Sequence, residues 1–294
     1  MADTPFINIS ATASLYSQIA GVLSGFAFTT LLSYLNRHTE EPIEPTPEQG
    51  AAHQLLSEVR RQVTIVLFNT LGALVVCAVL YGMLAGGPPD TGNSLSGIMV
   101  NGPAFGLAIL GMFFATALAA TPFKHLEPML ASARVLLAIV GPAIAMLLVA
   151  AASMDLFIKQ CRDVAPAGPC AATSQLTLTR PYGLGVWLTV LLALIGVVAL
   201  IAFRTPQSPA PAWTARAMAW LIIGVPAITV VGAIAVATMP ADYLLPDPLK
   251  IVIELATFAI LALFAVLAAR TCHHHPSNTE HRINRPEADT RIAA

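Results

Sequence analysis

Residues 184–203, LGVWLTVLLALIGVVALIAF, contain no charged side chain. A helix of this length rises about 30 Å, which is the thickness of the hydrocarbon core of a bilayer. A helix is stable in lipid because it satisfies its backbone hydrogen bonds within its own segment, where no water replaces them. The stretch therefore predicts a membrane-spanning helix.

The rest of the chain has the same character. Of its 294 residues, 56% are hydrophobic and 11% are charged, whereas soluble domains carry about 25% charged residues. Apolar runs of similar length recur, separated by polar stretches too short for a separate globular domain. We expect an all-α fold, a polytopic transmembrane helix bundle of about seven spans, at residues 16–35, 63–84, 104–121, 135–153, 184–203, 217–238 and 251–269.

The distribution of Lys and Arg predicts the orientation, because short cytoplasmic loops carry the excess of these residues. One side has 11 of them, namely Arg37, Arg60, Arg61, Lys124, Arg134, Arg204, Arg216, Arg270, Arg282, Arg285 and Arg291. The other side has 4, namely Lys159, Arg162, Arg180 and Lys250. The first side is therefore expected to be cytoplasmic, with the N-terminus outside and the C-terminus in the cytoplasm.

Two segments outside the spans have a recognisable pattern. Residues 47–62 predict an amphipathic cytoplasmic helix leading into the second span. We interpret it as a helix lying on the bilayer surface, with a partner-docking helix as the alternative. Residues 272–294 predict a disordered polar tail. The tail holds Cys272 and His273–His275, but no metal site is expected, because adjacent His residues cannot easily all face one ion in a regular helix.

The cysteines test the orientation independently. Cys161 and Cys170 fall in the loop between the fourth and fifth spans, on the side that the charges place outside. Disulfides persist in such an oxidising compartment. We therefore expect a disulfide between them, the alternative being two free thiols. Cys77 lies within a span and has no evident partner.

A recurring pattern suggests an internal repeat. Thr121-Pro122 is followed by Pro142 inside the next span, and Thr205-Pro206 is followed by Pro226, both pairs being related by 84 residues. This predicts repeated, proline-kinked helical hairpins formed by spans 3–4 and 5–6. Each mid-helix proline removes an amide donor and clashes with the carbonyl four residues earlier. Pro142 and Pro226 are therefore candidate hinges, or kinks that serve packing alone.

Few polar groups are predicted at membrane depth. Glu254 is the one ionisable side chain clearly inside a predicted span, and such a carboxylate is costly unless it is paired, protonated or facing water. It is a candidate intramembrane site, the alternative being an ion pair with Lys250 one turn earlier. Gln18 and Asn69 are candidate polar partners, although cross-helix hydrogen bonds for packing explain them as well. Asp155 is expected to be a solvated cap at the end of its span.

The first span carries small residues at every fourth position, including Ser17, Gly21, Gly25 and Thr29. Such a stripe lets another helix approach closely in lipid. It predicts tight packing within the bundle or a homo-oligomer contact.

Several classes of protein are not supported. The seven His residues all lie outside the spans, which argues against buried haem ligation and a Ser-His dyad in the membrane. No Lys lies mid-span, and there is no phosphate-binding glycine loop. The net charge is −1 and no basic patch stands out, so no nucleic-acid partner is expected. We expect neither an enzyme nor a bound cofactor.

The sequence leaves two functional hypotheses. The first is a permease, channel or transport accessory subunit, suggested by Glu254 and the kinked hairpins. The second is a sensor or interaction protein that acts through the amphipathic helix and the tail. The Ala-rich composition is similar to that of many bacterial membrane proteins, so we expect a multi-pass protein of a bacterial plasma membrane, in contact with the lipid bilayer.

Overall fold

The computed structural model describes residues 9–36, 50–87, 91–121, 123, 126–164, 181–203 and 212–271. Most of these residues are helical, and none of them lies in a strand. The helices are α1 (Ile9–Asn36), α2 (Gly50–Ala85), α3 (Gly92–Ala120), α4 (Glu127–Val135), the π-helical turn η2 (Leu136–Val140), α5 (Gly141–Val164), α6 (Pro181–Ala202), α7 (Ala212–Ala237) and α8 (Asp247–Thr271).

Seven helical segments among the described residues are long and apolar enough to cross a membrane, with α4, η2 and α5 forming one of them. Their outward faces carry large apolar side chains, such as Phe26, Trp220 and Val231, which are compatible with contact to lipid. The all-α fold and the seven apolar helices are therefore confirmed, and they suggest a multi-pass membrane protein. The orientation stays a prediction, so we name the end at which α1, α3, α6 and α8 begin the predicted outer end.

Several helices extend beyond the predicted spans. The third begins at Gly92 and not near Ala104, so Pro103 lies inside it. The fourth continues past Ser153 to Val164. Backbone hydrogen bonding propagates a helix through polar residues once the apolar part has formed it, and the pair of Lys159 and Asp163, 2.9 Å apart one turn from each other, supports the extension.

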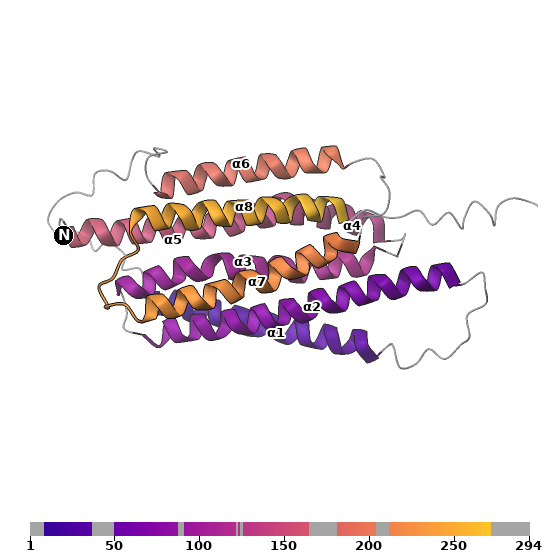
Figure 1. Cartoon of the computed structure of the whole chain (residues 1–294), viewed down its shortest axis with the longest axis horizontal. Helices are drawn as coiled ribbons and strands as arrows, with labels where there is room; N and C mark the ends of the chain where they lie inside the picture. Colours follow the sequence, from indigo (N-terminus) through magenta and orange to yellow (C-terminus); the bar gives the residue numbers. More distant parts are fainter. Residues whose placement is uncertain are drawn as a thin grey trace, which may run out of the picture.

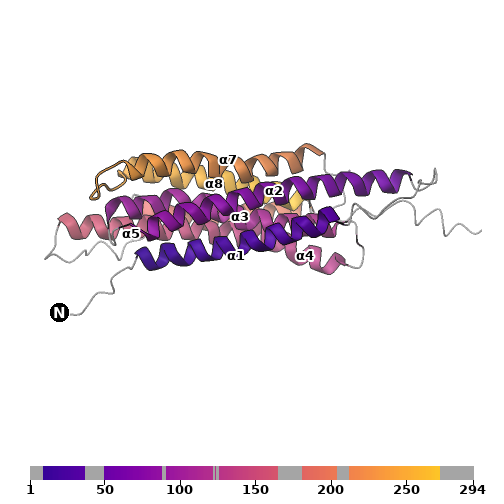
Figure 2. The same ribbon diagram turned by 90° about the horizontal axis from the view of Figure 1, so that it is seen from below.

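The helix α2 is continuous from Gly50 to Ala85, about 54 Å at 1.5 Å per residue. Its first turns project beyond the ends of the neighbouring helices (Figures 1 and 2). The surface-lying and the partner-docking interpretations of this helix both stay predictions. Residues 47–49 and the predicted tail, 272–294, lie outside the described residues.

The helix α3 is the centre of the bundle and the most buried of the seven spans. On one side it packs against α2 and α7, and α1 packs on α2. On the other side it packs against α5, which together with α6 and α8 forms the second group. Figure 1 shows α3 between these groups, with α6 at one edge and α1 at the other. Any site must therefore lie within one group or against α3.

The predicted hairpins differ in their packing. The helices α3 and α5 are in contact, but α6 packs on α5 and α8, whereas α7 packs mainly on α2 and α3. Figure 1 shows α8 between α6 and α7. The 84-residue duplication has no counterpart in these contacts and stays a prediction.

Pro142 has a visible effect on its helix. Because it cannot donate to the carbonyl of Ala138, the helix widens here into η2, where the amide of Gly141 bonds to the carbonyl of Leu136, five residues back. Gly196 of α6 lies directly over Ala138, so a Cβ at position 196 would collide with the Ala138 carbonyl oxygen. A glycine is required for this contact. Pro226 lies within α7, whose helical assignment is uninterrupted.

At the opposite end of the bundle, Arg134 in the last turn of α4 connects two other helices. Its Nη2 donates to the carbonyl of Phe203, at the end of α6, at 3.2 Å and to that of Ala269, in the last turn of α8, at 3.1 Å. Helix C-termini leave carbonyls without helical donors and carry a partial negative charge. The guanidinium therefore joins two helix ends that are far apart in sequence.

We predict that Gly196→Ala destabilises the fold, because the added methyl group forces α6 away from η2. Overpacking of this kind costs about 1–3 kcal/mol. Thermal unfolding of the purified protein in detergent measures the effect. Gly224→Ala in α7 is the matched control, since a Cβ there meets no atom within 4 Å. Equal unfolding temperatures for the two variants would show that α6 does not need the glycine.

Candidate functional site

One face of α8 is polar near the predicted outer end. Asp247, Lys250, Glu254 and Thr257 follow one another at intervals of three or four residues, so they share a face. This face turns towards α5 and α6, because α8 packs on both. Lys250 and Glu254 are almost completely buried, at 1% and 0% exposure. Glu254 lies seven residues inside α8, which is deeper than the predicted span suggested.

Lys250 does not pair with Glu254. Its Nζ lies 2.8 Å from Oδ1 of Asp247 and 3.2 Å from Oε1 of Gln160 in α5. Asp247 itself is half exposed. The alternative interpretation of Glu254, an ion pair with Lys250, is therefore wrong, because the ammonium group already has a carboxylate and an amide as partners at the end of the helix.

The carboxyl of Glu254 is enclosed without a hydrogen bond. Neither of its oxygens has a partner among the described residues, and neither does the buried hydroxyl of Ser153 in α5. The Ser153 hydroxyl nevertheless lies near the carboxyl, without the geometry of a hydrogen bond. The site therefore contains a carboxyl and a hydroxyl that lie close together, and neither has a hydrogen-bond partner among the described residues.

Gly185 of α6 closes the site. A Cβ at this position would lie 2.7 Å from the Cβ of Ala150 and 3.5 Å from the carboxyl carbon of Glu254. The missing side chain therefore lets α6 cover the carboxyl at van der Waals distance. Thr189, one turn further along α6, is also buried but bonds the Gly185 carbonyl at 2.9 Å.

The polar face of α8 stops halfway through the bundle. The hydroxyl of Thr257 donates to the carbonyl of Ile253 at 2.7 Å. The next residues on this face, Leu261 and Phe264, are buried and apolar. Polar groups thus connect Glu254 to the predicted outer end and not to the opposite end.

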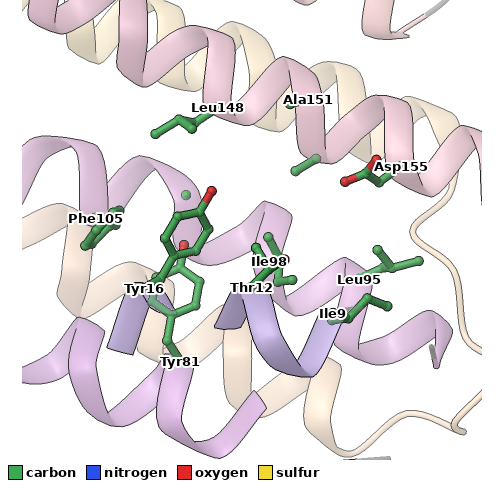
Figure 3. A pocket seen from close by; sticks show the side chains of 12 residues that line it. Ile9, Thr12, Tyr16, Tyr81, Leu95, Ile98, Phe105, Leu148, Ala151 and Asp155 are labelled. Atoms are coloured by element: carbon green, nitrogen blue, oxygen red, sulfur yellow. The ribbon is translucent and has the colours of Figure 1, made fainter. Parts of the chain in front are cut away.

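A small cavity lies on the other side of α5 (Figure 3). It has a volume of about 60 Å³ and is lined by residues of α1, α2, α3 and α5, among them Tyr16, Tyr81, Phe105 and Asp155. This is room for a few water molecules. The three rings pack at centroid distances of 5.3–5.6 Å. Figure 3 shows the carboxyl of Asp155 at one end of the cavity and Tyr16 near its middle.

Asp155 was therefore misinterpreted from the sequence as a solvated cap. Because α5 continues to Val164, Asp155 lies inside a helix and borders a cavity. The sequence contained a usable indication, since the polar residues that follow Ser153 include the intrahelical pair of Lys159 and Asp163.

The other predicted polar residues do not join Glu254. Gln18 is exposed on α1 and bonds Ser14 of the same helix at 3.2 Å. Asn69 of α2 donates to the carbonyl of Ala219 in α7 at 3.0 Å, which is the cross-helix bond considered for packing. Pro142 and Pro226 are buried at separate helix contacts. These residues do not converge on one cavity, and the candidate intramembrane site at Glu254 stays a prediction.

The small residues of the α1 stripe have two different surroundings, one within the bundle and one on its surface. The hydroxyl of Ser17 donates to the carbonyl of Ala78 in α2 at 2.9 Å. Gly21, Gly25 and Thr29 are exposed, and a Cβ at either glycine would meet no atom within 4 Å. The first part of the stripe therefore packs within the bundle, and the homo-oligomer contact stays a prediction for the rest.

Cys161 is disulfide-bonded and Cys77 is a free, buried thiol. Cys170 lies outside the described residues, so its pairing with Cys161 stays a prediction. Within the described residues, no group of three or more His, Cys, Asp or Glu side chains is arranged to hold a metal ion. Cys272 and the neighbouring His residues lie outside this part of the chain.

Comparisons of the chain with protein-family models, with curated proteins and with solved structures found no match.

We predict that Glu254→Met makes the protein more stable. Methionine has a similar volume and removes a buried carboxyl that lacks partners, which relieves a desolvation cost of about 1–3 kcal/mol. Thermal unfolding in detergent at neutral pH measures the change. Glu58→Met is the control, because Glu58 forms a partly exposed pair with Arg61, and such pairs contribute little. A lower unfolding temperature for Glu254→Met would mean that the carboxyl stabilises the native state.

Proposed function

We propose that the protein is a proton-linked transport protein of a bacterial plasma membrane, in which Glu254 binds and releases the transported or coupling proton. The observation that carries this proposal is the enclosure of both Glu254 oxygens without a hydrogen bond. Ionisable residues at membrane depth are expensive, and proton relays in pumps and transporters are built from them.

The surroundings of Glu254 favour a proton over a metal cation. A metal ion needs several oxygen ligands, but Ser153 is the other unsaturated oxygen donor identified beside the carboxyl. A proton needs neither a coordination shell nor room. It neutralises the carboxylate and removes the cost of burying a charge.

The polar residues of α8 support proton entry from one side. Asp247 is exposed, Lys250 and Gln160 follow, and Glu254 lies below them. Beyond Thr257 the face is closed by Leu261 and Phe264. Polar side chains therefore lead from the predicted outer end to the buried carboxyl. Transport then requires a rearrangement of α6 or α8, because these two helices cover the carboxyl.

We predict that the reconstituted protein conducts protons and that Glu254→Gln abolishes the flux. Proteoliposomes containing a pH-sensitive dye and a valinomycin-clamped potassium gradient are acidified outside, with and without a panel of small solutes. Wild type should acidify the lumen faster than protein-free liposomes, and Glu254→Gln should match the latter. Glu58→Gln is the matched control and should retain the flux. The proposal is wrong if wild type equals protein-free liposomes, or if Glu254→Gln transports like wild type.

A second candidate, a sensor or interaction protein, is favoured by one observation. The first turns of α2 project past the bundle (Figures 1 and 2), on the side that the charges place in the cytoplasm. Here Glu58 bonds both Arg61 and Gln62 at 2.9 Å, which stabilises the helix beyond the apolar part of α2. A projecting helix of this kind offers a surface to a soluble partner.

This candidate predicts that a cytoplasmic partner is lost when residues 40–56 are replaced by a Gly-Ser linker of equal length. Cross-linking in intact membranes followed by affinity capture identifies the partners of the two proteins. The loss of a reproducible partner, with unchanged proton flux, would favour an interaction role. Identical sets of captured proteins would leave α2 without such a role.

A further inference from the structure

A second and larger cavity lies between α2, α3 and α7, away from Glu254. Its volume is about 200 Å³. Its wall includes Met83 and Leu84 of α2, Ser94 and Asn101 of α3, and Ile234 and Ala237 of α7. All three helices contribute residues from the half of the bundle that contains the predicted outer end.

Asn101 is an unsaturated polar group in this wall. It is 1% exposed, and neither its amide nitrogen nor its carbonyl oxygen has a hydrogen-bond partner among the described residues. A carboxamide offers two donors and one acceptor oxygen, and buried polar groups in proteins are almost always bonded. The Asn101 side chain is therefore available to a ligand that both donates and accepts a hydrogen bond.

The rest of the wall defines the chemistry of that ligand. The residues that line the cavity include no Lys, Arg, His, Asp or Glu, and most are apolar. A charged group would therefore have no counterion in this space. Met83 of α2 and Ile234 of α7 are 71% and 59% exposed, so the cavity wall continues onto an apolar outer face that is compatible with contact to lipid. An uncharged molecule with an apolar body fits these walls.

We propose that this cavity binds a neutral lipid with a free hydroxyl group, of which a monoacylglycerol is the simplest example. A monoacylglycerol has two free hydroxyls, of which one accepts from the Asn101 amide nitrogen and the other donates to its carbonyl oxygen. Cavities that enclose a whole drug-sized ligand measure about 300–1,000 Å³. At about 200 Å³, this one holds the headgroup and the start of the chain, and the remaining chain lies between Met83 and Ile234 in the bilayer.

Photolabelling tests the proposal. The protein in phosphatidylcholine nanodiscs is labelled with a monoacylglycerol that carries a diazirine in its chain, and the modified residues are identified by mass spectrometry. Labelling should map to α2, α3 and α7 near the cavity. Monooleoylglycerol should compete, and its di-O-methyl ether, which cannot donate, should compete at least about tenfold less well.

Variants separate a specific site from an apolar surface. Asn101→Leu should reduce specific labelling at least about tenfold. Ala237→Trp should do the same by filling the cavity from an exposed position, where folding does not depend on the residue. Gln18→Leu is the matched control, because Gln18 is an exposed amide on α1, and it should label like wild type.

The proposal is overturned if wild type shows no competable labelling, if the ether competes as well as the alcohol, or if labelling survives in both Asn101→Leu and Ala237→Trp. Glu254→Gln should label like wild type, because Glu254 lies between α5, α6 and α8. A failure of lipid binding would therefore be distinct from a failure of proton transport.

Discussion

The contact on which the α5, α6 and α8 half of the bundle depends is that between the backbones of α5 and α6. Gly185 and Gly196 let α6 lie directly on Ala150 and Ala138. In lipid the hydrophobic effect does not hold helices together, so close packing at small residues has to do so. At Gly196 the contact falls on the carbonyl that Pro142 leaves without its helical donor. At Gly185 it closes the space above Glu254. The two glycines of α6 thus account both for the close helix packing and for the enclosure of the candidate site.

The pairing of Lys250 follows from the direction of helical side chains. The Cα–Cβ bonds of a helix tilt towards its N-terminus, which in α8 is the predicted outer end. A long Lys side chain extends towards water when it can. Both effects carry the ammonium group up to Asp247 and Gln160, at 2.8 and 3.2 Å. Glu254 is left below them, and its neighbours Gly185, Ala150 and Ser153 cannot neutralise it. The charge of the carboxyl can therefore be removed by a proton.

Much of the fold could be predicted, because lipid and the length of the apolar segments restrict the backbone structures that a membrane-spanning chain can adopt. Apolar stretches such as 184–203 allow only one backbone structure at membrane depth, so the seven apolar helices and Glu254 followed from the sequence. Helix ends were harder, since polar residues continue α3 back to Gly92 and α5 to Val164. Asp155 and Asn101 were missed for this reason, because the predicted spans left both outside or at the edge of the membrane.

The partner that each polar side chain meets could not be predicted from the sequence. Gln18, Asn69 and Glu254 were equivalent as polar residues in apolar segments, but they meet different surroundings. Gln18 is exposed, Asn69 donates to the carbonyl of Ala219, and the Glu254 oxygens have no hydrogen-bond partner among the described residues. Which of these outcomes occurs depends on how each helix is rotated against its neighbours, and the hydropathy of a single segment contains no such information.

Three buried polar side chains without a hydrogen-bond partner lie near the predicted outer end. Glu254, Ser153 and Asn101 lie in the half near the predicted outer end, on opposite sides of α3. In the other half, α8 presents Leu261 and Phe264, and Arg134 bonds the ends of α6 and α8. Unbonded buried groups lower stability, so a fold retains them most readily where well-packed parts compensate. The closed half, with its capped helix ends, supplies that compensation. It holds the helices in place, and the half above it contains the groups that would bind the proposed proton and lipid.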